Sequence, residues 1–215
     1  MKLIGKLRSA GQILCNEGFR GVFRAACQNI YSRETFLIYR RNWDLKKKEL
    51  DHRTGLNFFL AGEEHLPIIL EHWPMEFGRI GRDRVLLAVM LRERWAKGGR
   101  CFFAECDEVF CGALWTEEWQ WGFGDMLGGD SKRMFEYVNV FIRPEVRKLG
   151  AGGGLIRFAG YHMAELGCEI GIARVQLDRH ASMAMFEKCG FERKGCLVSG
   201  HLLGFDMRTL TQNGI

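Results

Sequence analysis

A glycine-rich segment near the middle of the chain carries the clearest chemical signal. Arg147 precedes four glycines within Gly150–Gly154, and Pro144 separates this segment from an apolar stretch that starts at Tyr137. Such a pattern predicts a strand, a turn and a helix that begins on the glycines. The first N–H groups of a helix have no intrahelical partner, and glycine lets an anion approach them without a Cβ in the way. With the Arg147 guanidinium beside these donors, the segment predicts a binding site for a phosphate or pyrophosphate group.

Two common phosphate-binding loops do not fit this segment. A P-loop requires Gly-Lys-Ser/Thr after its last glycine, whereas Leu155 follows Gly154. A dinucleotide-binding fingerprint requires a further glycine three residues after Gly152, where Leu155 also stands. The remaining alternative is a glycine-rich helix start without a ligand, but each helical glycine costs about 1 kcal/mol relative to alanine. The cluster of glycines therefore favours an anion site of another kind.

The elements that must position this segment alternate between strands and helices from Thr54 onward. Further strands are expected at residues 57–60, 100–106, 109–116, 173–177, 192–199 and 201–208, and further helices at 65–77, 81–97 and 181–189. The aromatic and glycine-rich stretch 117–133 has two interpretations, a segment over a pocket or a loop whose tryptophans cap the core. A length of 215 residues with 47% hydrophobic residues allows one domain with a proper core plus an extension.

Two motifs resemble those of the GNAT superfamily of N-acyltransferases. The pattern Arg147-x-x-Gly150-x-Gly152, after Pro144 and an apolar strand, resembles the loop that binds the acyl-CoA pyrophosphate. The second GNAT motif, usually written N-x-x-[AS]-x-x-x-Y-E-K-x-G-F, is similar to the segment Arg179-His-Ala-Ser182-Met-Ala-Met-Phe186-Glu187-Lys188-Cys-Gly190-Phe191. The two motifs stand in the right order, and the resemblance covers roughly residues 54 to 210.

The resemblance implies an α/β fold in which helices flank a central, mostly antiparallel twisted sheet. The central strand would diverge in a V from the strand at 173–177, and acyl-CoA, in the simplest case acetyl-CoA, would lie in that V. An amine would attack the thioester directly while a main-chain N–H stabilises the oxyanion. The cofactor-binding residues implied by the family are Val140, Phe141, Ile142, Arg147, Lys148, Leu149, Gly150, Ala151, Gly152, Gly153 and Phe186. No metal is expected.

The second motif departs from the family pattern at two positions. Arg179 replaces Asn, and Phe186 replaces the Tyr that many members use to protonate the leaving thiolate. A phenyl ring donates no proton, so another residue or water would supply the acid, or the thiolate leaves unassisted, since a simple thiol has a pKa of about 8.5. A binding protein that retained the cofactor site and lost the activity is a further alternative. The candidates for the base that deprotonates the amine are Glu136, Asn139, Asp178 and His180, with Glu136 first.

Basic residues concentrate at the N-terminus. Residues 1–48 contain eleven Lys/Arg and three Asp/Glu, whereas the remainder of the chain is slightly acidic. Spacing of apolar residues predicts helices there, so residues 1–50 are expected to form a basic helical extension and residues 51–215 the catalytic domain. The extension either packs on the domain or lies on an anionic membrane or acidic partner, and a transit peptide is disfavoured by the apolar run Phe36–Tyr39 and by Trp43. An adaptor that docks through these helices is the alternative to an enzyme.

Cysteine usage and apolar runs favour a cytoplasmic protein, peripheral to a membrane at most. The eight cysteines form no C-x-x-C pair, which favours free thiols in a reducing compartment. Lys6 and Arg8 interrupt any signal-peptide run, and the longest apolar run, Val85–Leu91, is too short to cross a bilayer. The acceptor amine, the acyl length and a homodimer are left open, although the slightly acidic catalytic part favours cationic acceptors over nucleic acid.

Overall fold

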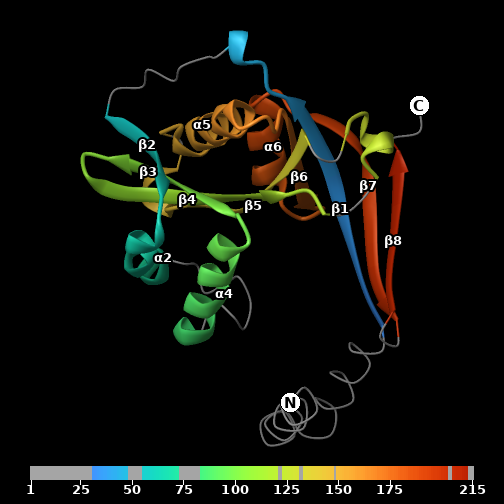
Figure 1. Ribbon diagram of the computed structural model, residues 1–215, viewed down its shortest axis with the longest axis horizontal. Helices are drawn as coiled ribbons and strands as arrows, with labels where there is room; N and C mark the ends of the chain where they lie inside the picture. Colours follow the sequence, from blue (N-terminus) through green and yellow to red (C-terminus); the bar gives the residue numbers. More distant parts are fainter. Residues whose placement is uncertain are drawn as a thin grey trace, which may run out of the picture.

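A mixed β-sheet forms the centre of the protein (Figure 1). The computed structural model describes residues 31–47, 55–72, 83–120, 123–130, 133–147, 149–202 and 205–212. Within these residues the strands are β1 (Tyr31–Asn42), β2 (Leu56–Ala61), β3 (Arg100–Cys106), β4 (Val109–Glu118), β5 (Met134–Ile142), β6 (Ile170–Gln176), β7 (Glu192–Leu202) and β8 (Phe205–Gln212). The α-helices are α2 (Leu66–His72), α4 (Arg84–Ala96), α5 (Ala151–Glu165) and α6 (His180–Lys188). Short 3₁₀ helices occur at η1 (Leu45–Lys47), η2 (Glu63–His65), η3 (Asp125–Leu127) and η5 (Pro144–Val146).

Helices cover both faces of the sheet. Figure 1 shows α5 and α6 on one face and α2 and α4 on the other. Side chains alternate along β5, so Phe135 and Tyr137 belong to the core under α5 and α6, whereas Val138 packs on the core under α2 and α4. A third apolar cluster, outside both helix pairs, consists of Ile38, Trp119, Leu127, Met134, Ile170, Ile172, Leu197 and Leu210. Trp119 and Leu127 therefore show that part of the 117–133 stretch caps the core.

The strand pairing confirms the predicted fold class. The sheet order is β2-β3-β4-β5-β6-β1-β7-β8, and the pair β5 and β6 is parallel while the other neighbouring pairs in the described sheet are antiparallel. The parallel pairing runs only from Met134↔Ile170 to Tyr137↔Ala173, although β5 continues to Ile142 and β6 to Gln176. The two strands part after Tyr137, as a V-shaped divergence requires.

The predicted helices and strands also occur in the expected order. The hairpin of β3 and β4 turns on Asp107 and Glu108, whose positive φ angles of 50° and 64° match a two-residue turn of type I′. The helix predicted at 81–97 begins at Arg84, because Asp83 caps it by accepting hydrogen bonds from Val85 N and Leu86 N. The helix predicted at 65–77 ends at His72 in the described part, and residues 73–82 lie outside it. Among the helices described, none has the length and apolar character needed to cross a membrane.

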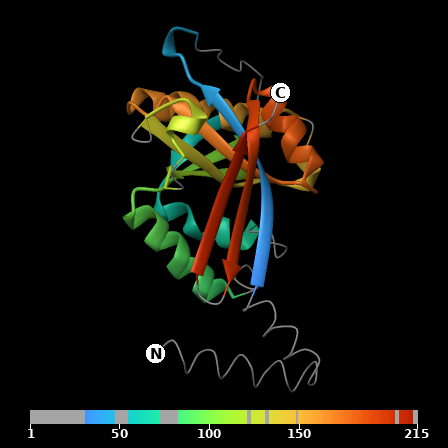
Figure 2. The same ribbon diagram turned by 90° about the vertical axis from the view of Figure 1, so that its right-hand side faces the viewer.

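The predicted domain boundary at residue 51 is wrong. Residues 31–42 form β1, which pairs with β6 on one side and β7 on the other, as Figure 2 shows for the long strands β8, β7 and β1. Leu37, Ile38 and Tyr39 are buried in succession, because a central strand buries both of its faces. The prediction of a separate helical extension therefore fails for residues 31–47. Residues 1–30 and 48–54 lie outside the described residues, and with them the predicted helices and their membrane or partner contact.

Side chains of β1 and of the residues after it hold helix α6 and the end of α5. The Tyr39 hydroxyl donates to Glu187 Oε1 at 2.9 Å, and burial, with a smaller effect of this carboxylate, raises the pKa of Tyr39 to about 12. Arg41 Nη1 donates to the Cys189 carbonyl at the end of α6. The Trp43 ring packs edge-on against Tyr161, with ring centroids 5.1 Å apart. The N-terminal strand is thus part of the core and not an accessory.

A chain shortened to begin at Asp51 should not fold. It loses β1, so β6 and β7 lose their common partner and the buried side chains of β1 leave a large cavity. Circular dichroism during heating should show no cooperative transition. A matched chain that begins at Asn29 keeps β1 and should unfold cooperatively. Similar cooperative melting of both chains would show that β1 is not required for the sheet.

Candidate active site

The divergence of β5 from β6 coincides with a bulge in β5. Ala113 of β4 pairs with Phe141, but Trp115 pairs with Val138, so one residue of β4 faces two residues of β5, Asn139 and Val140. Asn139 has a φ of 51°, in the left-handed region that few residues other than glycine adopt. Beyond Tyr137, β5 has no ladder partner on its β6 side within the described sheet. Backbone groups of this strand are therefore available for a ligand that enters the V.

The glycine-rich loop adjoins the open end of this V. Gly150 has a φ of 91°, which favours glycine, and α5 begins at the next residue. The amide of Gly154 makes the first helical hydrogen bond, to the Gly150 carbonyl at 3.0 Å, so the amides of residues 151–153 precede the helical ladder. Arg147 Nε donates to the Ile142 carbonyl at 3.2 Å, which joins the loop to the end of β5. The structure thus brings Val140–Ile142 together with the loop, while Lys148 lies outside the described residues.

Two of the glycines also serve packing, which the sequence pattern did not reveal. A Cβ at Gly152 would lie 2.8 Å from Met185 Sδ, and a Cβ at Gly154 would lie 2.3 Å from Phe58 Cζ. Both distances are shorter than real Cβ contacts, so a side chain at either position would displace Met185 or Phe58, through which α5 packs on α6 and β2. The glycines at 152 and 154 thus have a structural reason in addition to the predicted anion site.

Phe186, at the position of the family's tyrosine, is buried below this site. Its ring is 4% exposed and packs edge-on against Tyr137 and Phe191, at centroid distances of 5.9 and 5.1 Å. Asp178, Arg179 and His180 are exposed where β6 leads into α6. Of the four candidate bases, Asp178 and His180 thus belong to the exposed junction of β6 and α6, whereas Glu136 and Asn139 belong to β5.

A cluster of four charged side chains lies beside the bulge. Glu117 of β4 pairs directly across the sheet with Glu136 of β5. Two carboxylates in such positions repel each other unless cations compensate them. Arg94 Nε lies 2.5 Å from Glu117 Oε1, and Arg174 Nε forms an ion pair with Glu136 Oε1. Sequence reasoning missed Glu117 and both arginines, because only the strand register and the packing of α4 place them next to Glu136.

The members of this cluster differ in accessibility. The side chain of Glu136 is 5% exposed and paired with Arg174, whereas the side chain of Glu117 is 37% exposed. Burial lowers the pKa of Arg94, an effect that the nearby carboxylates of Glu117 and Glu136 oppose, and a guanidinium stays charged throughout the physiological range. The Arg94 Nη1 also donates to Asn139 Oδ1 at 2.9 Å. Within the described residues, His, Cys, Asp and Glu side chains form no group of three that could hold a metal ion.

Comparisons with known proteins agree with this geometry. A family model described as Acetyltransferase (GNAT) family matches residues 66–191. A ribosomal-protein-alanine N-acetyltransferase from Brucella melitensis is 19% identical with a TM-score of 0.53, over 72% of this chain and 99% of the other. The structure of AAC(6')-Iy with a bisubstrate analogue, CoA-S-monomethyl-acetylneamine, is 20% identical with a TM-score of 0.52, over 64% of this chain and 91% of the other. A search of curated proteins found no match.

A Drosophila protein is also similar, at 11% identity and a TM-score of 0.56, over 89% of this chain. The present chain spans only 58% of that protein's length. At these identities the solved structures show the fold alone. The family model, in contrast, matches more than half of the chain and includes β5, the glycine-rich loop and the second motif. The chain belongs to the GNAT family of acetyltransferases.

Proposed function

We propose that this protein is an N-acetyltransferase that transfers the acetyl group of acetyl-CoA to a primary amine. The observation that carries the proposal is the open V between β5 and β6, with the glycine-rich start of α5 at its mouth. The pantetheine arm would hydrogen-bond to the backbone at Val140–Ile142, and the pyrophosphate would bind the amides at the start of α5. The AAC(6')-Iy structure, a complex with a bisubstrate analogue of CoA, supports an acyl-CoA as the co-substrate.

The amine would approach from the face covered by α2 and α4, where Glu117 and Glu136 lie. Glu117 is the more accessible carboxylate, so we assign it the role of attracting the acceptor's ammonium group. Glu136 remains a candidate for the base. Because its side chain is buried and paired with Arg174, it would act behind Glu117 and take the proton of the amine through water. Once neutral, the amine attacks the thioester carbon, the carbonyl oxygen becomes an oxyanion on a main-chain N–H of β5, and the CoA thiolate leaves.

The Gly152→Val variant tests the cofactor site. A branched side chain at this position obstructs the start of α5, so affinity for acetyl-CoA should fall by at least about tenfold, equivalent to about 1.4 kcal/mol. Isothermal calorimetry measures the affinity, and a Met185→Ala variant controls for altered packing of α6, because Met185 is the side chain that a Cβ at Gly152 would displace. Unchanged affinity in Gly152→Val, with normal affinity in the control, would contradict the cofactor assignment.

The Glu117→Gln variant tests the acceptor face. If the Glu117 carboxylate attracts the ammonium group, its neutral analogue should raise the KM for a cationic amine by about fivefold or more and leave the KM for acetyl-CoA unchanged. Glu118→Gln is the matched control, because the next residue of a strand points to the opposite face of the sheet. The assay is thiol release over a panel of amines. Equal effects of the two variants would contradict this role of Glu117, and acetyl-CoA binding without transfer to any amine would favour a sensor or adaptor.

The Phe186→Tyr variant tests whether the enzyme lacks an acid. We expect turnover within about threefold of the original protein, a change of under 1 kcal/mol in the barrier, because the thiolate is a good enough leaving group near neutral pH. General acid catalysis typically contributes about 10² to 10⁴ in rate. A hundredfold gain at saturating acetyl-CoA would therefore show that departure of the thiolate needs an acid that this chain does not supply.

A further inference from the structure

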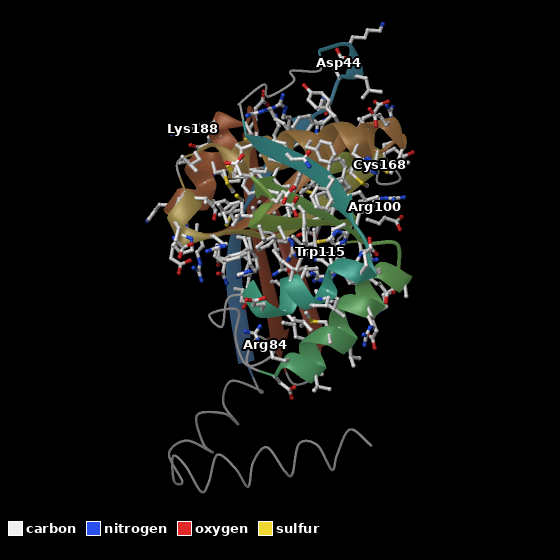
Figure 3. All side chains as sticks on the ribbon, turned by 90° about the vertical axis from the view of Figure 1, so that its left-hand side faces the viewer. Asp44, Arg84, Arg100, Trp115, Cys168 and Lys188 are labelled. Atoms are coloured by element: carbon white, nitrogen blue, oxygen red, sulfur yellow. The ribbon has the colours of Figure 1, made fainter. Side chains whose placement is uncertain are left out.

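Arg94 of α4 contacts both β4 and β5 near the point where β5 parts from β6. Its Nη1 donates to Asn139 Oδ1 at 2.9 Å, and its Nε lies 2.5 Å from Glu117 Oε1. Its guanidinium carbon lies 5.2 Å from the centre of the Trp115 ring. In Figure 3 Trp115 lies between the sheet and helices α2 and α4. One side chain therefore joins a helix to β4 and β5, and its 17% exposure leaves it little freedom to move.

The residue that Arg94 holds in β5 has an unusual backbone conformation. Asn139 has a φ of 51° and is one of the two β5 residues that face a single residue of β4. This conformation is less favourable for a residue with a Cβ than for glycine; Asn tolerates it better than most, and a hydrogen bond of its side chain helps to hold it. The hydrogen bond from Arg94 acts on the Asn139 side chain itself and is one such constraint. The guanidinium is a rigid fork, so it can hold Asn139 and Glu117 at fixed relative positions.

The position of this bulge determines the direction of the backbone that would contact the acyl group. Tyr137 is the last β5 residue paired with β6, and Asn139 follows two residues later. The expected contact with pantetheine starts at Val140, the second bulge residue, and continues through Phe141 and Ile142. A small rotation at Asn139 would therefore turn the N–H groups of these residues away from the thioester carbonyl. Hydrogen bonds to a developing oxyanion depend strongly on such geometry.

We propose that Arg94 is a positioning residue that keeps Asn139 in its left-handed conformation and so aims the β5 backbone at the acyl carbonyl. This inference rests on the proposed transferase function. It assigns to α4 a part in transition-state stabilisation, separate from the attraction of the amine by Glu117. A loss of Arg94 should therefore reduce kcat by a larger factor than it weakens acetyl-CoA binding, because the pyrophosphate contacts at the glycine-rich loop lie on the opposite face and are kept.

Single variants of Arg94 test the first part of the proposal. Arg94→Met removes the guanidinium and should lower kcat by about tenfold or more, with the acetyl-CoA dissociation constant within about threefold of the original. Arg94→Lys keeps the charge but not the fork, and should lose most of the same activity. The matched control is Arg92→Met, since Arg92 lies on the same helix, is 59% exposed and contacts only Glu63, at 3.7 Å, among the ion pairs described. An unchanged kcat in Arg94→Met would overturn the proposal.

Substitutions of Asn139 separate positioning from a purely structural role. Glycine adopts a φ of 51° without strain, so Asn139→Gly should keep at least about threefold more activity than Asn139→Ala, although both remove the side chain. In the Asn139→Gly background, Arg94→Met should cost less than about threefold, because the backbone no longer depends on the arginine. An equal loss from Arg94→Met in both backgrounds, or equal activity of the Gly and Ala variants, would refute the mechanism.

The experiment also distinguishes failure of this inference from failure of the proposed function. If the protein without substitutions binds acetyl-CoA but acetylates no amine in the panel, the transferase assignment is contradicted. In that case amide hydrogen exchange still tests the inference, since exchange at Asn139 and Val140 should be faster in Arg94→Met than in Arg92→Met. Equal exchange in the two variants would mean that Arg94 does not hold the bulge. Thermal unfolding of every variant, measured alongside, shows that each is folded at the assay temperature.

Discussion

The early end of the parallel pairing between β5 and β6 determines the architecture of the site. Backbone N–H and C=O groups inside a protein need partners, and a strand that leaves its neighbour creates unpaired groups at once. Here the pairing stops at Tyr137, and the bulge at Asn139 turns the rest of β5 away. The glycine-rich start of α5 adds a second set of free amides at the same opening. A ligand rich in carbonyl and phosphate oxygens suits these donors.

An opening of this kind weakens the middle of a sheet, and β1 compensates on the far side of β6. It supplies an antiparallel partner along Phe36–Asn42 and a second ladder to β7. Its side chains then anchor α6 through Tyr39 and Arg41, so the helix that carries the second family motif is held by a strand almost 150 residues earlier in the chain. The basic strand β1 thus has a structural use, because Leu37, Ile38 and Tyr39 are buried and Arg40 and Arg41 donate to carbonyl oxygens.

The charged cluster beside the bulge, formed by Glu117, Glu136, Arg94 and Arg174, bears on both the stability and the function of the protein. Two carboxylates opposite each other on β4 and β5 would destabilise the sheet, and Arg94 and Arg174 offset this repulsion. Burying such pairs seldom gains stability over an apolar core of the same shape. We attribute the arrangement to the proposed chemistry, in which Glu117 would attract the acceptor amine, while Arg94, which pairs with Glu117, also donates to Asn139 at the bulge. In this proposal, charge compensation, backbone geometry and substrate attraction depend on the same few side chains.

Local patterns in the sequence were sufficient for the elements from β2 to β8, for the glycine-rich loop and for the family, because hydrophobic periodicity, turn residues and helix starts are properties of neighbouring residues. The tertiary structure alone decided three things. It placed β1 inside the sheet, although the spacing of apolar residues near the N-terminus had suggested a helical extension over residues 1–50. It brought Arg94 and Glu117 beside Asn139 and Glu136, and it showed that Gly152 and Gly154 also make room for Met185 and Phe58. Each of these depends on strand register or packing between segments distant along the chain, which the spacing of residues in one segment does not encode.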